Sequence, residues 1–135
     1  MRNFFTLAEF LRSSKAKTLC IDNTPSFEVV DNLRLLRDNI LNPLRQEFGE
    51  PILITSGYRS PRLNAAVGGS VNSQHMLGQA ADIKAAHGGM EANRRLFAIV
   101  QRLQLPFDQM VNEYNFAWLH LSYSPRHRRQ ILVKP

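Results

Sequence analysis

The sequence predicts an α+β domain in which helices pack on one face of a small antiparallel sheet. Two observations support this prediction. Apolar residues recur at helical spacing through much of the first third, whereas short β-branched and apolar runs fill the last third. Helices followed by strands are typical of α+β folds, in which the helices lie to one side of the sheet. The chain has 135 residues, the size of one domain, so we expect residues 1–135 to form a single domain.

Two helices are expected before residue 50. Residues 6–9 (TLAE) fit a capping box, which opens a short helix ending at about Ser13. In the longer helix, Thr24 is the expected N-cap, Pro25 the first helical residue and Gly49 the C-terminal glycine. Its buried face is marked by apolar residues three or four positions apart: Val29, Leu33, Leu36, Ile40 and Leu44.

Pro43 lies inside this helix, and we expect it to kink the helix or break it near residues 40–42, because proline cannot donate the helical hydrogen bond. The remainder of the chain predicts a second amphipathic helix at 90–103 and five short strands. The expected strands are residues 51–55, 80–84, 107–111, 117–123 and 130–133.

Composition limits the possible partners and metal ligands. Lys and Arg number 17 against 11 Asp and Glu, a formal net charge of +6, which favours an anionic partner such as nucleic acid, an acidic polymer or cell wall. Nucleic-acid binding through the basic run 126–129 is disfavoured, because the run has no interleaved aromatic beyond Tyr123 and no familiar nucleic-acid motif. The single cysteine, Cys20, excludes an internal disulfide or a thiolate cluster, so a metal site must use His, Asp and Glu.

Two of the four histidines have surroundings that fit metal binding. His87 precedes two glycines and His127 lies in the basic run, so we expect both to face solvent. His120 shares one face of a strand with Trp118 and Ser122, a setting that by itself is more typical of a core histidine. His75 and Asp82 are seven residues apart, with Gly78 between them to turn the chain. Together, His75, Asp82 and His120 form an N/O donor set that zinc accepts in catalytic sites, where a fourth position stays open.

These residues carry a resemblance to a known family. The pattern Ser73-x-His75-x-x-Gly78-x-Ala80-x-Asp82, followed by Trp118-x-His120, resembles peptidase M15, the zinc D-Ala-D-Ala carboxypeptidases and peptidoglycan endopeptidases. Residues 56–61 (SGYRSP) and 63–69 (LNAAVGG) are also similar to this family, closest to its short, single-domain bacterial and phage branch. The resemblance extends over residues 4–123.

The resemblance implies a fold, a cofactor and roles for particular residues. The fold would be that shared by D-Ala-D-Ala peptidases and hedgehog domains. One Zn²⁺ would be held by His75, Asp82 and His120, and a zinc-activated water would hydrolyse peptide bonds in peptidoglycan stem peptides. Arg59 would pair with an anionic group of the substrate, since its planar guanidinium suits a carboxylate, and Ser73 would donate a hydrogen bond to the substrate. Whether the enzyme is a carboxypeptidase or an endolysin-type endopeptidase stays open.

The general base is where this sequence departs from the pattern. Some relatives carry a glutamate three residues before the last histidine ligand, but Ala117 occupies that position here. Glu113, seven residues before His120, is the expected catalytic base, and Asp108 or an unaided zinc-hydroxide is the alternative. The missing glutamate also keeps open a zinc-bearing binding module of the same fold with little or no turnover.

Residues 1–11 do not fit a secretory signal, because Glu9 interrupts their apolar stretch. No stretch approaches the roughly 18 apolar residues of a membrane span. We therefore expect a protein that is cytoplasmic as synthesised and that reaches the cell wall after lysis or by an unidentified route of release. The sequence does not indicate an oligomeric state, so a monomer is the default expectation.

Overall fold

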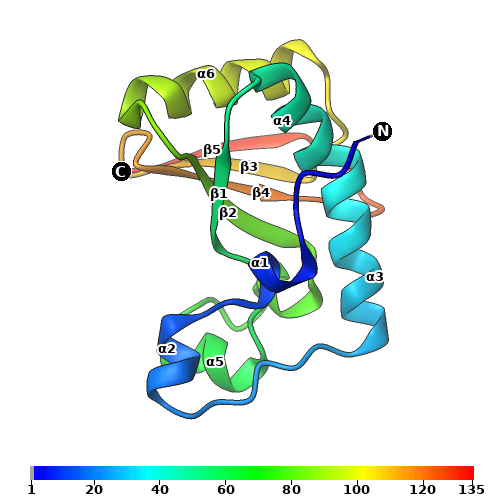
Figure 1. The fold of residues 1–135 in the computed structure, drawn as a ribbon, viewed down its shortest axis with the longest axis vertical. Helices are drawn as coiled ribbons and strands as arrows, with labels where there is room; N and C mark the ends of the chain where they lie inside the picture. Colours follow the sequence, from blue (N-terminus) through cyan, green and yellow to red (C-terminus); the bar gives the residue numbers. More distant parts are fainter. Residues whose placement is uncertain (1) are drawn as a thin grey trace.

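The computed structural model describes residues 2–135 and shows an α+β fold built on a five-stranded sheet (Figure 1). The sheet has the strand order β1-β2-β4-β3-β5. The strands are β1 (Ile52–Ser56), β2 (Ala80–Ala85), β3 (Gln109–Glu113), β4 (Trp118–Ser122) and β5 (Gln130–Lys134). The predicted α+β class is confirmed, and each strand lies within a residue or two of its expected position.

The sheet is mixed rather than purely antiparallel, so that detail of the prediction was wrong. The β1–β2, β2–β4 and β4–β3 pairs are antiparallel, but β3 and β5 run parallel. The chain leaves β4, crosses the start of β3 and enters β5 in the direction of β3. Backbone hydrogen bonds from Arg129 to Phe107 and from Gln130 to Asp108 fix this crossing. The pairing is non-local, so strand periodicity could not reveal it.

The long helix is continuous but changes to π-helical geometry just before Pro43, close to where a kink or break was expected. It consists of α3 (Phe27–Leu36), a π-helical turn η1 (Arg37–Leu41) and α4 (Asn42–Phe48), with Pro43 in the first turn of α4. Helices are irregular at prolines and at π-helical turns, and here the two fall together. Gly49 ends α4 in the left-handed conformation, as expected.

The start of α3 differs from the prediction. Its N-cap is Ser26, whose side chain accepts a hydrogen bond from the backbone N–H of Val29. Thr24 instead belongs to a preceding turn, where its N–H binds the Asp22 carboxylate. The Thr24-Pro25 pair therefore lies before the helix, and the helix begins two residues later than expected.

Within residues 2–135 there are four further α-helices. The capping box predicted at residues 6–9 is present and opens α1 (Leu7–Leu11), and α6 (Gly89–Arg102) matches the second amphipathic helix. Two helices were not predicted, α2 (Ser14–Thr18) and α5 (Pro61–Ala66), because one or two turns show no apolar period. A short 3-10 turn, η2 (Gln74–Leu77), precedes β2.

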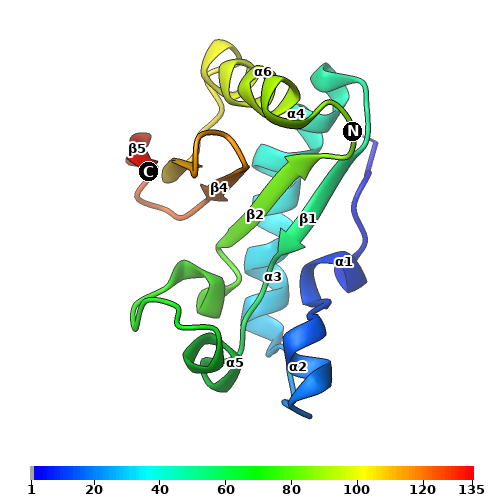
Figure 2. The same ribbon diagram turned by 90° about the vertical axis from the view of Figure 1, so that its left-hand side faces the viewer.

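The helices cover one face of the sheet and leave the other to carry polar side chains. The covered face contributes fully buried residues such as Ile83, Leu119 and Met110 to the core, and α3 lies behind β1 and β2 in Figure 2. Side chains alternate along each strand, so the opposite face carries the cross-strand pairs Asp82–His120 and Glu113–Trp118.

Candidate metal centre

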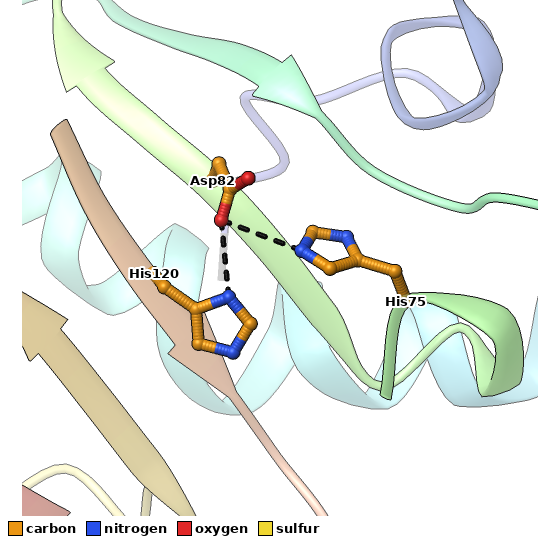
Figure 3. A group of neighbouring side chains, drawn as sticks. All are labelled: His75, Asp82 and His120. Atoms are coloured by element: carbon orange, nitrogen blue, oxygen red, sulfur yellow. Dashed lines mark hydrogen bonds and ion pairs between the residues drawn. The ribbon is translucent and has the colours of Figure 1, made fainter. Parts of the chain in front are cut away.

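His75, Asp82 and His120 converge on one point at this open face (Figure 3). His75 lies on η2, whereas Asp82 and His120 are directly opposite each other on β2 and β4. One oxygen of Asp82, Oδ1, lies 3.0 Å from His120 Nδ1 and 3.4 Å from His75 Nε2. One ligand atom from each residue fits within 4.8 Å of the others. The structure thus brings together the three predicted metal ligands.

A main-chain carbonyl orients the His75 ring. His75 is 2% exposed, and its Nδ1–H donates to the carbonyl oxygen of Gly57 over 2.7 Å. This bond occupies Nδ1 and leaves Nε2, which is aimed at Asp82, as the nitrogen for a metal ion, which is how metal-bound histidines are usually supported. This acceptor could not be named from the sequence, because it is a backbone atom 18 residues away.

The Asp82 carboxylate is held in its ionised form. Burial alone would raise its pKa, but hydrogen bonds from His120 and His75 and the charge of both rings more than offset this, and the pKa lies well below its usual range. An ionised carboxylate beside two imidazole nitrogens is a donor set suited to zinc. The residues therefore fit a single divalent ion with three protein ligands.

Arg59 lies beside this cluster in a cleft of about 490 Å³ that Asp82 also lines. Burial lowers the pKa of Arg59, while the negative charges of Asp82 and Glu113 oppose that shift. The guanidinium therefore interacts electrostatically with both carboxylates. Its Nε–H is buried and, among residues 2–135, has no hydrogen-bond partner. A guanidinium with free donors in a cleft can bind a carboxylate.

Ser73 has a structural role in addition to the predicted one. Its Oγ accepts a hydrogen bond from the His75 N–H over 3.2 Å and so caps η2. The predicted hydrogen bond from Ser73 to substrate stays a prediction.

Glu113, the expected base, lies at the end of β3 on the same face as the metal cluster. Trp118 Nε1–H donates to Glu113 Oε2 over 2.8 Å, and Lys134 Nζ lies 3.8 Å from Oε1. The side chain is 14% exposed. These contacts orient the carboxylate while leaving it partly open to solvent. Trp118, for which the sequence predicted only a place on the same strand face as His120, is thus a direct partner of the candidate base.

Asp108 is engaged elsewhere, which argues against it as the alternative base. It is fully buried, and Arg128 binds both carboxylate oxygens, at 2.8 Å through Nε and 2.9 Å through a terminal nitrogen. The Arg128 backbone N–H and Gln74 Nε2 also donate to it, at 3.1 and 2.9 Å. The hydrogen bonds from Arg128 lower the pKa of Asp108 well below its usual range, although burial opposes the shift. A carboxylate with this many donors is a poor proton acceptor.

The other two histidines lie outside the cluster and are exposed, as predicted: His87 and His127. No helix within residues 2–135 is long and apolar enough to cross a membrane.

The fold and the cluster define a class of protein, an α+β domain with a candidate metal centre of the open, three-ligand type. Residues 3–122 match the family model of peptidase M15, so the chain belongs to the peptidase M15 family, and the resemblance seen in the sequence is confirmed. A 50-residue stretch is 44% identical to the zinc D-Ala-D-Ala carboxypeptidase of Streptomyces albus G. That stretch covers 36% of this chain and 20% of the Streptomyces protein.

Proposed function

We propose that this chain is a zinc metallopeptidase that hydrolyses peptide bonds in peptidoglycan stem peptides. The observation that carries the proposal is the convergence of His75, Asp82 and His120 on one point, with the His75 tautomer fixed by Gly57. Membership of peptidase M15 supports peptide hydrolysis. The name of the Streptomyces relative supports zinc and a D-Ala-containing substrate.

Zinc would be held by His75 Nε2, Asp82 Oδ1 and His120 Nδ1. When bound, the ion would lower the pKa of a coordinated water toward ~7 and polarise the scissile carbonyl. Metal binding requires each of these atoms to be unprotonated, so the proton with which His120 Nδ1 hydrogen-bonds to Asp82 must leave when the ion binds.

Glu113 would act as the general base. Its carboxylate would accept the proton of the attacking water and return it to the leaving amine. The hydrogen bond from Trp118 fixes Oε2, so Oε1, which has the longer contact to Lys134, is the freer oxygen for this transfer. Arg59 would bind the carboxylate of the substrate at the edge of the cleft, and Ser73 would add a hydrogen bond to it.

Metal analysis combined with product analysis tests the proposal. The purified chain is expected to bind one zinc ion and to cleave muropeptides, with the fragments identified by mass spectrometry. Release of single D-Ala indicates a carboxypeptidase, and larger fragments indicate an endopeptidase. A protein that binds no zinc, or that leaves all muropeptides intact, contradicts the proposal.

A second candidate is a zinc-bearing binding module of the same fold with weak or absent turnover. The observation in its favour is Ala117, at the position where some relatives have a glutamate. Zinc and muropeptide binding without hydrolysis would favour it.

We further propose that the chain is a monomer. Size-exclusion chromatography with light scattering measures its molar mass and checks this.

A further inference from the structure

The cleft beside the metal cluster extends beyond Arg59 toward the α1–α2 junction. Its lining includes Asp82 and Arg59 and also two further cations, Arg12 and Lys15. Figure 2 shows α2 and α5 at the same end of the molecule, beyond the last residues of β1. The volume of about 490 Å³ is within the range of cavities that enclose a ligand much larger than one terminal residue.

The cations of this cleft are not neutralised by the protein. Within residues 2–135, no carboxylate lies within 4 Å of Arg12, Lys15 or Arg59, although other arginines have such partners. Arg95 lies 3.1 Å from Glu50, for example, and Arg102 lies 2.9 Å from Glu47. Like charges gathered in one cleft attract and orient an anionic ligand.

One substrate carboxylate is not enough to pair these groups. A carboxylate bound by Arg59 would pair one of the three cations and leave Arg12 and Lys15 of the same cleft to bind another anionic group. We propose that Arg12 and Lys15 recognise a second carboxylate of the substrate, away from the bond that is cut, so that the preferred substrate is an acidic peptide. This inference rests on the proposed peptidase function and names the substrate class for it.

Matched peptides test this preference. The two peptides of each pair have the same C-terminal carboxylate. They differ at one internal position, where one peptide has glutamate and the other glutamine. A separate pair is made for every internal position. The zinc-loaded protein is compared with the double variant Arg12→Gln/Lys15→Gln. Lys17→Gln is the control, because Lys17 is exposed on the same helix but does not line the cleft. All three side chains are exposed, and circular dichroism checks that each variant folds.

At one position or more, kcat/KM of the unaltered protein is expected to be about tenfold higher for the acidic peptide than for the amide. The double variant should reduce this ratio to about twofold or less, and Lys17→Gln should leave it in place. High salt should reduce the ratio of the unaltered protein as well, because partly exposed charges are screened.

The outcomes separate this inference from the function on which it rests. Hydrolysis without any acid preference, or a preference that survives in the double variant, overturns the inference and leaves the peptidase in place. If no peptide is cut, dissociation constants of the same pairs are measured by calorimetry. An acid preference in binding that the double variant loses then supports the recognition of a second carboxylate while removing the peptidase function.

Discussion

Glu113 is the side chain on which turnover is expected to depend most directly. It touches Trp118 and Lys134 but belongs to no part of the ligand cluster. Glu113→Gln is therefore expected to lower kcat/KM by about 10²–10⁴-fold, the usual contribution of a general base, while the bound zinc stays at one ion per chain. Steady-state kinetics with metal analysis measures both quantities.

The matched control for that variant is Glu91→Gln, because Glu91 is an exposed glutamate paired with Arg94 on α6. It should leave both kinetics and metal content unchanged. Full activity of Glu113→Gln would show that Glu113 is not the general base. The metal site alone would then have to activate the water.

Individual residues of the site differ in how visible they are in the sequence. His75 and Asp82 could be found because they fall in one short pattern, and His120 because the Trp118-x-His120 pattern of the family follows it. The acceptor for His75 could not be found, since it is the carbonyl of Gly57 rather than a side chain. The donor role of Trp118 depends on the β3–β4 register, which periodicity does not specify.

At the scale of elements, Gly78 connects the ligand-bearing turn η2 to β2 and lies against α3. Its φ is +72°, and a Cβ there would lie 2.6 Å from the Val29 carbonyl oxygen. Gly78→Ala should therefore destabilise the fold by about 1–2 kcal/mol for the left-handed backbone, with about 1–3 kcal/mol more for the overlap. Urea denaturation measures the free energy of unfolding.

Gly49→Ala separates the two effects in the prediction for Gly78. Gly49 has a φ of +78°, but a Cβ there would meet nothing within 4 Å, so only the backbone cost is expected. Equal losses of stability in the two variants would show that the approach of η2 to α3 does not matter.

A second element-level feature is the segment between β4 and β5, which is fastened by Arg128 to Asp108. Because folding lowers the pKa of Asp108, the unfolded chain binds more protons below about pH 4. The stabilisation from this ion pair is therefore complete above that pH and is lost as the pH falls through the folded pKa. Gln74 also binds Asp108, so the same ion pair supports the turn that carries His75.

Asp108→Asn is expected to lower the free energy of unfolding at pH 7 by about 2–3 kcal/mol, since a buried hydrogen-bonded charge is removed. It should also flatten the dependence of stability on pH below 4. Asp31→Asn, at an exposed pair with Arg34, is the control and should change stability by less than about 0.5 kcal/mol. A variant at 108 with unchanged acid sensitivity contradicts the assignment.

Some features of the helices and strands could be predicted from the sequence, and others could not. The irregular turn before α4 was predictable because proline cannot donate the helical hydrogen bond at its own position. The true N-cap was missed because Thr24 and Ser26 are both good caps, and the Asp22 turn that selects Ser26 is a matter of local geometry. The parallel placement of β5 depends on Asp108 and Arg128, which are 20 residues apart.

For the whole molecule, the main expectation is coupling between metal binding and stability. The three ligands come from η2, β2 and β4, and only the folded chain brings them together. Zinc at about a thousandfold above its dissociation constant should add about 4 kcal/mol, which raises the Tm by roughly 10–20 °C. Differential scanning calorimetry with and without a chelator measures this shift.

His120→Ala should lose most of the shift, whereas His127→Ala should keep it, because His127 lies outside the cluster. An equal response of both variants would mean that zinc binds elsewhere.

The net charge of +6 is also clearer in the context of the whole fold. Arg128 of the basic run 126–129 is bound to Asp108, and Arg129 donates to the Gln104 carbonyl. Part of the run therefore serves the packing of the C-terminal segment. In the part of the chain that the structure describes, the cations without a carboxylate within 4 Å include those of the cleft, which places unpaired positive charge next to the candidate metal centre.

The contact between His75 and Gly57 has a consequence for how this site tolerates sequence change. The acceptor is a backbone atom, so replacing the side chains around it does not remove it. The exception is Gly57 itself, where a Cβ would overlap the Phe10 carbonyl oxygen and displace the chain. Only such a shift of the chain could break the hydrogen bond. Side chains that line the cleft can therefore change, and the ligand preference can change with them. The His75 ring would still present Nε2 to the metal ion.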